Sequence, residues 1–212
     1  RKMSAELAQE RGSFPNLPRS MHAKKFKLLR NATTTSIAPT GSISIIANTT
    51  SGIEPFFAIA FVRDVMGGTK LLEVNPYFEQ VAKERGFYTK ELMIKIAKSG
   101  SIQKVAGIPA DVKKAFVTSF DIKPEWHVKM QAAWQKFTDN AVSKTVNLPN
   151  NAKPQDVEKI YQLAHKLQCK GITVYRYGSK KDQVLTIGKI PAEQVTVEEE
   201  FAGGCPSDVC PF

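Results

Sequence analysis

Residues 31–44 have the sequence Asn31-Ala-Thr-Thr-Thr-Ser-Ile-Ala-Pro-Thr-Gly-Ser-Ile-Ser44, and this stretch decides the fold. Its first half is rich in β-branched residues, which predicts a strand over residues 31–37. Ala38-Pro39-Thr40-Gly41 is typical of a turn, and the apolar run at 42–47 predicts the start of a helix. The sequence therefore places the end of a strand next to the start of a helix, with a turn between them.

The turn offers hydrogen-bond donors to an anion. The first N–H groups of a helix lack intrahelical acceptors, and the helix dipole favours negative charge there. Thr40, Ser42 and Ser44 add hydroxyl groups, and Gly41 lets a ligand approach the backbone closely. No Lys follows the glycine, so this is not a Walker motif. The residues alone leave two interpretations open: a phosphate site, or an ordinary Ser/Thr cap without a ligand.

Three long motifs follow one another along the chain. They are residues 30–47 with Ser51-Gly-Ile-Glu-Pro55, residues 126–149 beginning Trp126-His-Val-Lys-Met, and Cys169-Lys-Gly-Ile-Thr-Val-Tyr-Arg-Tyr-Gly-Ser179. Together they closely resemble the large catalytic chain of ribonucleotide reductase, in particular its class II, adenosylcobalamin-dependent branch. The resemblance covers most of residues 20–188.

This resemblance implies the C-terminal part of a ten-stranded α/β barrel, with a helical insertion and a flexible C-terminal tail. It implies a ribonucleoside di- or triphosphate substrate whose phosphates are held by the turn, mainly through backbone amides. The residues implied are Ala38, Pro39, Thr40, Gly41, Ser42 and Ser44. It also implies adenosylcobalamin as the cofactor that generates a cysteine thiyl radical.

The family's radical cysteine lies in an Asn-x-Cys-x-Glu loop, and this sequence contains no such motif. We therefore expect a fragment that needs the upstream half of the same catalytic chain for activity, and a homodimer when the chain is intact. We divide the fragment into residues 1–188, the barrel part, and residues 189–212, the tail.

The middle of the chain predicts a strand and then helices. Residues 56–63 form a continuous apolar run, which predicts a strand buried on both faces of a barrel or parallel sheet. Residues 75–120 predict a helical insertion, with helices at 75–84, 89–99 and 109–118.

A βαβ unit is predicted after the insertion. Residues 124–140 form an amphipathic helix whose stripe of Trp126, Met130, Trp134 and Phe137 is expected in the core. A strand at 142–148, a helix at 154–168 with Gly171 as its C-cap, and a strand at 172–176 follow. Because ligands bind at the carboxyl ends of strands in such folds, we expect the turn at 38–44 to lie there.

Two cysteines lie close together at the end of the sequence. Cys205 and Cys210 follow an acidic stretch, and a short spacer on a free tail permits a disulfide with little strain. The residues alone leave open a redox shuttle, half of a zinc site, or two incidental thiols. The resemblance implies the shuttle, in which the pair reduces an active-site disulfide and is regenerated by a thioredoxin or glutaredoxin-type protein.

Three other residues carry separate predictions. Cys169 ends a predicted helix and is expected to be a small core residue. Glu54 is expected to have a structural role near the substrate rather than a catalytic one. Tyr175 stands where the cobalamin-independent branch has two adjacent tyrosines, so radical transfer through it is not expected.

Composition limits the remaining functional classes. The 212 residues are 42% hydrophobic, enough for a real core, and no apolar run is long enough to span a bilayer, so we expect a soluble, cytoplasmic protein without membrane partners. The net charge of +10 suits an anionic substrate. Its lysines are scattered, so we expect no nucleic-acid partner, and the isolated histidines predict no metal site.

Two alternatives stay open on sequence alone: a class I reductase chain, or a non-enzymatic basic module that binds nucleotides or nucleic acid.

Overall fold

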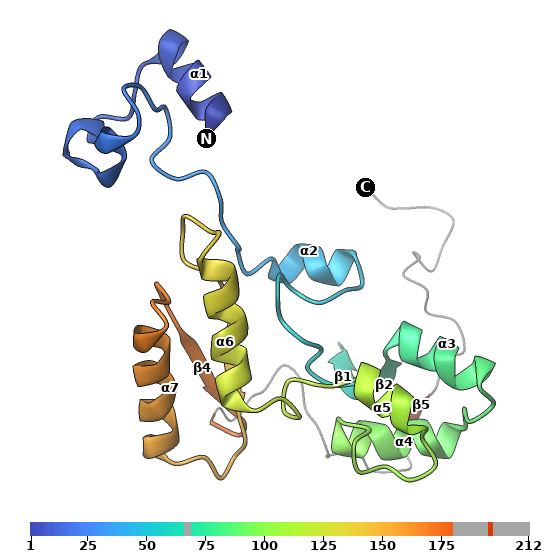
Figure 1. The fold of residues 1–212 in the computed structure, drawn as a ribbon. Coiled ribbons are helices and arrows are strands. Elements are labelled where there is room, and N and C mark those ends of the chain that lie inside the picture. Colours follow the sequence, from blue (N-terminus) through green and yellow to red (C-terminus); the bar gives the residue numbers. More distant parts are fainter. Residues whose placement is uncertain (66–68, 180–194, 197–212) are drawn as a thin grey trace, which may run out of the picture. The chain divides into compact units, whose positions relative to one another are not determined.

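The computed structural model describes residues 1–65, 69–179 and 195–196, and the chain divides into two compact units. Unit 1 consists of Arg1–Glu54 and Lys123–Tyr177 (Figure 1). Unit 2 consists of Pro55–Ile122 with the described residues from Gly178 onward. The predicted boundary between residues 188 and 189 lies outside the described residues and stays a prediction.

Unit 1 starts with helix α1 (Lys2–Arg11) and two short 3₁₀ helices, η1 (Leu17–Arg19) and η2 (Met21–Lys24). The buried Ser4 connects α1 to the segment that follows. Its hydroxyl accepts a hydrogen bond from the Asn31 N–H at 2.9 Å, and its carbonyl accepts one from the Arg30 N–H at 3.0 Å. The start of the decisive stretch is therefore fixed against α1.

The strand predicted at 31–37 does not form. Only one parallel bridge remains, between Ile37 and Val142, and the side chains of residues 31–36 are exposed. The segment instead bonds to the loop at 139–140: the Asn140 N–H donates to the Thr35 carbonyl at 3.1 Å. Residues 31–37 have the strand propensity that the prediction used, but in the described part of the chain no second strand lies along them to pair with. The predicted helix does form, as α2 (Gly41–Ile46).

The βαβ unit is confirmed. After helix α6 (Pro124–Gln135), strand β3 (Thr145–Leu148) and strand β4 (Thr173–Arg176) pair in parallel, joined by helix α7 (Pro154–Lys166). Figure 1 shows α6 and α7 beside this pair of strands. The predicted inner face of α7 is also confirmed, since Ile160 and Ala164 are buried against the strands. The predicted C-cap is wrong: α7 ends at Lys166, and Gln168 takes the left-handed conformation, with φ 59°.

The predicted inner face of α6 is wrong as well. The stripe residues are exposed: Trp126 by 60%, Met130 by 50%, Trp134 by 46% and Phe137 by 82%. The helix buries its other face, which carries His127, Val128, Gln131 and Ala132. Gln131 joins this face to the strands, because its amide donates to the carbonyls of Val142 at 3.1 Å and Gly171 at 2.6 Å.

Unit 2 contains an antiparallel hairpin and three helices. Strands β1 (Ala60–Val65) and β2 (Thr69–Val74) pair antiparallel, and β5 (Val195–Thr196) pairs in parallel with β2. The strand predicted at 56–63 therefore starts later, and its first partner is antiparallel rather than parallel. The predicted helices are present as α3 (Pro76–Glu84), α4 (Lys90–Ser99) and α5 (Ala110–Ala115). Their core is built around Phe78, Met93 and Ile96.

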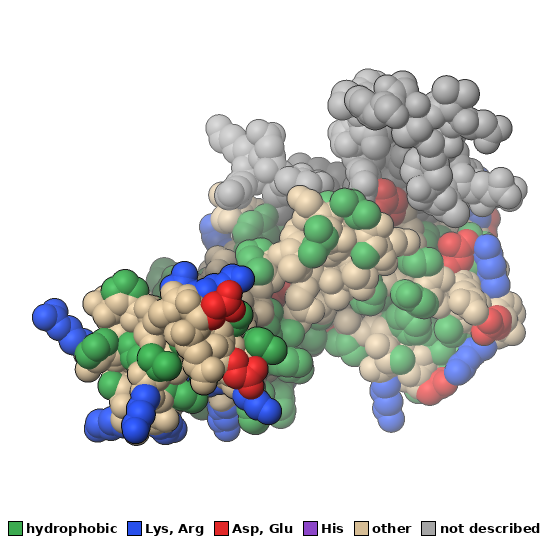
Figure 2. Space-filling model, turned by 90° about the horizontal axis from the view of Figure 1, so that it is seen from above, with side chains coloured by type: hydrophobic (Ala, Val, Ile, Leu, Met, Phe, Trp, Pro, Cys, Tyr) green, Lys and Arg blue, Asp and Glu red, His purple; other side chains and the backbone are tan. Residues whose placement is uncertain are grey.

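The described residues thus form part of an α/β architecture, with helices and a few strands in two small sheets. The expected ten-stranded barrel stays a prediction, because the described strands form one sheet of three strands and one of two. None of the helices in the described part of the chain is long and apolar enough to cross a membrane. On the visible face in Figure 2, Lys and Arg side chains are scattered among apolar and polar ones.

Candidate functional site

The turn before α2 leads into the candidate site. Thr40 precedes the helix in the left-handed conformation, with φ 52° and ψ 30°. Its hydroxyl accepts a hydrogen bond from the Gly52 N–H at 3.0 Å, which holds the turn against the loop after α2. Gly52 also has a positive φ of 50°, and a Cβ there would lie 3.3 Å from the Ala38 carbonyl oxygen. Only glycine suits this close approach.

The hydroxyl of Ser44 is used inside the protein. It donates to the Gly41 carbonyl at 2.8 Å and lies 3.1 Å from the Ser51 hydroxyl, and Ser44 itself is buried. The backbone amides at the start of α2 are different, because the first N–H groups of a helix have no intrahelical acceptor. A ligand at this turn would therefore meet backbone amides rather than the hydroxyls of Thr40 and Ser44.

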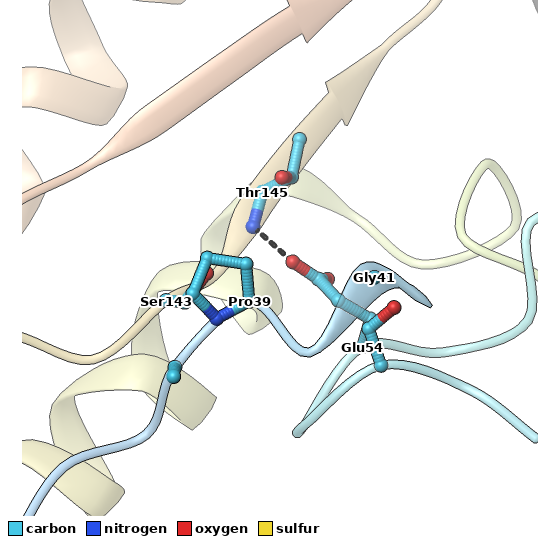
Figure 3. Close-up of a pocket in the computed structure, with 7 residues that line it drawn as sticks. Pro39, Gly41, Glu54, Ser143 and Thr145 are labelled. Atoms are coloured by element: carbon cyan, nitrogen blue, oxygen red, sulfur yellow. Dashed lines mark hydrogen bonds between the residues drawn. The ribbon is translucent and has the colours of Figure 1, made fainter. Parts of the chain in front are cut away.

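A polar pocket of about 220 Å³ lies beside the turn, within unit 1. Figure 3 shows Thr145 at the start of β3 with its N–H directed at the Glu54 carboxylate, and Pro39 and Gly41 of the turn near them. Its lining residues are Ala38, Pro39, Gly41, Ser51, Glu54, Ser143 and Thr145. Of the predicted phosphate-site residues, the structure thus brings Ala38, Pro39 and Gly41 to the pocket. Thr40, Ser42 and Ser44 are not among its lining residues.

The pocket lies beside the amino end of β3. Ser143 and Thr145 are at the amino end of β3, whereas the carboxyl ends of β3 and β4 are at Leu148 and Arg176. The reason is the short pairing at Ile37–Val142: the segment before the turn leaves the sheet where β3 begins. The turn therefore follows its own extended segment, as predicted, but stands beside the start of its neighbour.

Glu54 connects the pocket to a buried cation. One carboxylate oxygen accepts a hydrogen bond from the Thr145 N–H at 2.5 Å (Figure 3), and the other lies 2.6 Å from the Lys144 ammonium. The Lys144 side chain is only 2% exposed. Burial lowers the pKa of Lys144, and the neighbouring Glu54 partly offsets that effect. These contacts give Glu54 structural partners on the strand side, and its role toward a substrate stays a prediction.

A second carboxylate holds the segment that leads into the turn. Asp139, in the loop after α6, accepts hydrogen bonds from the Thr34 N–H at 2.8 Å and the Thr34 hydroxyl at 3.0 Å, and it pairs with Arg1. These donors lower the pKa of Asp139 to about 2. The backbone of the same loop also contacts this segment, because the Asp139 N–H donates a hydrogen bond to the Thr35 hydroxyl at 2.8 Å.

The remaining predicted residues are Cys169, Tyr175 and the redox pair. Cys205 and Cys210 fall outside the described residues. Cys169 packs half-buried against the core of the βαβ unit, as expected, and burial raises the pKa of its thiol. Tyr175 lies on β4. Within residues 1–65, 69–179 and 195–196, no group of three or more His, Cys, Asp and Glu side chains could hold a metal ion.

Sequence reasoning missed Ser51, Ser143, Thr145 and Lys144. One signal was available for Lys144: it occupies the alternating register of Val142, Val146 and Leu148, all of them buried. A lysine in a buried register needs partners and often marks a functional site. Ser143 and Thr145 gave no comparable signal, because they belong to this site only through the fold.

The fold and the pocket define an α/β protein with a small polar site between a turn and a parallel strand. Comparison with known proteins identifies it further. The family described as "Ribonucleotide reductase, barrel domain" matches residues 27–175. The chain belongs to this family.

Individual relatives point to one branch of the family. The vitamin B12-dependent ribonucleoside-diphosphate reductase of Mycobacterium tuberculosis is 50% identical over 209 residues, covering 99% of this chain and 29% of that protein. That of Thermoplasma acidophilum is 46% identical over 226 residues, covering 99% and 29%. Among solved structures, the alpha subunit of Actinobacillus ureae class Id ribonucleotide reductase has a TM-score of 0.65 at 27% identity, covering 84% of this chain and 31% of that one.

The chain is therefore homologous to vitamin B12-dependent ribonucleotide reductases, which confirms the class II resemblance over the class I alternative. It spans 29% of the length of the two B12-dependent relatives named above. Family membership also favours the reductase over the non-enzymatic module.

Proposed function

We propose that this chain is the C-terminal part of the catalytic barrel of a vitamin B12-dependent ribonucleoside-diphosphate reductase, and that its pocket at 38–41 binds the phosphates of the substrate. The observation that carries the proposal is the pocket itself: a polar cavity of about 220 Å³ bounded by Ala38, Pro39 and Gly41, at the amino end of α2.

The chemistry of the pocket suits an anion held by backbone amides. Unpaired N–H groups at the start of a helix point along its axis and bear partial positive charge. Gly41 has open space where a side chain would project, with nothing within 4 Å of the position that a Cβ would take. A phosphate oxygen can therefore approach the backbone at this residue without displacing a side chain. Ser143 on the opposite wall offers a further hydroxyl.

Adenosylcobalamin, which the B12-dependent relatives imply, does not fit this pocket. A corrin macrocycle with its nucleotide loop is much larger than a cavity of about 220 Å³. We therefore assign no described residue to the cofactor. We propose that the upstream half of the catalytic chain contributes to its site, together with the radical cysteine.

We further propose that Cys205 and Cys210 form the redox pair of the reductase. Thiol–disulfide exchange within a dithiol requires two thiols that can bond to each other, and the four residues that separate Cys205 from Cys210 are a spacing short enough for this. A thioredoxin or glutaredoxin-type protein would then regenerate the pair. A homodimeric, cytoplasmic enzyme is part of the same proposal.

The phosphate site is tested by Gly41→Val in a full-length reductase. The added side chain projects into open space, so the fold should tolerate it, but the pocket should be obstructed. We expect the KM for a ribonucleoside diphosphate to rise at least ten-fold, with an unchanged circular dichroism spectrum. Gly171→Ala is the matched control: its Cβ would lie 3.9 Å from that of Ala141, an ordinary contact, and Gly171 does not line the pocket.

An unchanged KM in Gly41→Val would place the phosphates elsewhere. An equal rise in both glycine variants would show that the effect is not specific to the pocket.

A further inference from the structure

Lys144 is a buried cation directly behind the proposed phosphate pocket. Its neighbours in the same register, Val142 and Val146, are apolar and buried, as expected next to α6. Lysine is among the residues least often found fully buried, and a buried charge is destabilising unless it is paired and hydrogen-bonded. A lysine at position 144 therefore needs hydrogen-bonding and charged partners, and the structure has them.

Three acceptors surround the Lys144 ammonium. They are a Glu54 carboxylate oxygen at 2.6 Å, the Thr145 carbonyl at 2.5 Å and the His127 Nδ1 at 2.8 Å. An ammonium has three donors and no acceptor, so these contacts match the protonated form of lysine. His127 Nδ1 accepts from the ammonium in the tautomer that carries the ring proton on Nε2. The surroundings of Lys144 thus contain one negative charge, that of Glu54.

Glu54 is the only acidic residue among those that line the pocket in the described part of the chain. Its carboxylate faces a site for which an anion is proposed, and two like charges at short range repel each other. The Lys144 ammonium, at 2.6 Å, cancels that charge and holds one carboxylate oxygen, while the Thr145 N–H holds the other. The wall of the pocket is then neutral and fixed in place.

We propose that Lys144 is a positioning residue of the pocket, which acts through Glu54 to make the pocket receptive to phosphate. This inference rests on the proposed function, because it requires that the pocket binds the substrate's phosphates. Lys144 itself does not line the pocket, so its influence passes through the neutralised carboxylate.

A double-mutant cycle in a full-length reductase tests the proposal, with cytidine diphosphate as the probe and its Kd as the readout. Lys144→Met keeps the length of the side chain but leaves the Glu54 carboxylate uncompensated. We expect its Kd to rise at least ten-fold. Glu54→Gln completes the cycle: it removes the repelling charge but also leaves the buried Lys144 ammonium without its counter-charge, so the decisive comparison is between Lys144→Met and the double variant. In the double variant Lys144→Met/Glu54→Gln, we expect the Kd to return to within about three-fold of the wild type.

The double variant also guards against a failure to fold, since replacing both members of a buried ion pair by neutral groups is generally tolerated better than removing one. The proposal is overturned if Lys144→Met binds as tightly as the wild type. It is equally overturned if the double variant is as weak as Lys144→Met, because the loss would then come from packing rather than charge.

Failure of this inference can be separated from failure of the proposed function. If Gly41→Val weakens binding but Lys144→Met does not, phosphates occupy the pocket and only the role of Lys144 is refuted. If neither variant changes the Kd, the phosphate assignment itself is wrong.

Discussion

Asp139→Asn should weaken the attachment of the segment that leads into the turn at residues 38–41. The carboxylate accepts two hydrogen bonds from Thr34, at 2.8 and 3.0 Å, and pairs with Arg1. Its side chain is only 17% exposed, so water screens these contacts only in part. The substitution keeps the shape and one acceptor oxygen but removes the charge.

The magnitude follows from the pKa of Asp139. Thr34 and Arg1 lower it from its ordinary value of 3.8 to about 2, and each pKa unit corresponds to about 1.4 kcal/mol. The interactions of the charged form therefore contribute at most roughly 2.5 kcal/mol, and since asparagine retains one acceptor we expect a smaller loss, of about 1–2 kcal/mol, at pH 7. Because the folded-state pKa is the lower one, this contribution is fully present above pH 3.8 and is lost as the pH falls through about 2.

The assay is urea unfolding of the chain followed by tryptophan fluorescence. Both tryptophans, Trp126 and Trp134, lie on α6, so the signal reports the unit that contains Asp139. The free energy of unfolding should be lower in Asp139→Asn by the same amount at pH 7 and pH 5, and the difference should shrink below pH 4. Glu158→Gln, an exposed substitution in the same unit, is the control and should have little effect.

Equal stability of Asp139→Asn and wild type at pH 7 would refute the reasoning. A loss that persists undiminished near pH 2 would also refute it, because the charge would then not be its cause.

Two further predictions concern the tail and the end of α7. In a full-length reductase with Cys205 and Cys210 both replaced by serine, turnover should stop after about one cycle when thioredoxin is the reductant but continue with dithiothreitol. The measurement is the amount of deoxynucleotide formed per enzyme. Sustained turnover with thioredoxin would exclude the pair as the relay. Gln168→Gly should raise the free energy of unfolding by about 0.5–1 kcal/mol in the same urea assay, because Gln168 has φ 59°, where glycine is not strained. A destabilised Gln168→Gly variant would show that the glutamine side chain matters more than its backbone.

The parts of the fold that could be predicted are those that depend on local pattern. Helix α7 and the parallel pair β3–β4 follow from an amphipathic repeat between two β-branched runs, and both are present. The turn and the start of α2 follow from Pro39, Thr40 and Gly41. In each case, neighbouring residues in the sequence supply most of the physical reason for the element.

The failures have a different cause. In α6, the spacing of Trp126, Met130 and Trp134 correctly places them on one face, but spacing does not say which face the protein covers. The buried face instead includes Gln131, whose amide bonds to backbone carbonyls of two segments. Hydropathy counts such a residue as polar, although its hydrogen bonds make it suitable for a buried position.

The candidate site was half predictable for a similar reason. One wall of the pocket, at residues 38–41, could be predicted because its proline and glycine are typical of a turn. The other wall, Ser143 and Thr145, is separated from it by about 100 residues and is recruited by folding. On this second wall the sequence offers one signal: Lys144 is a charged residue that alternates with the apolar Val142 and Val146, all three of them buried in the structure.

Two carboxylates connect the chain segments that carry these walls, through the hydrogen bonds of Asp139 to Thr34 and the ion pair of Glu54 with Lys144. Asp139 holds the segment before the turn, and Lys144 holds Glu54 after α2, so both flanks of the phosphate turn are attached to the stretch between α6 and β3. The position of the turn relative to β3 therefore depends on residues that do not line the pocket. Under the proposed function, substitutions in this stretch should alter phosphate affinity without contacting the substrate, because the positions of the backbone amides depend on the segments that hold the turn.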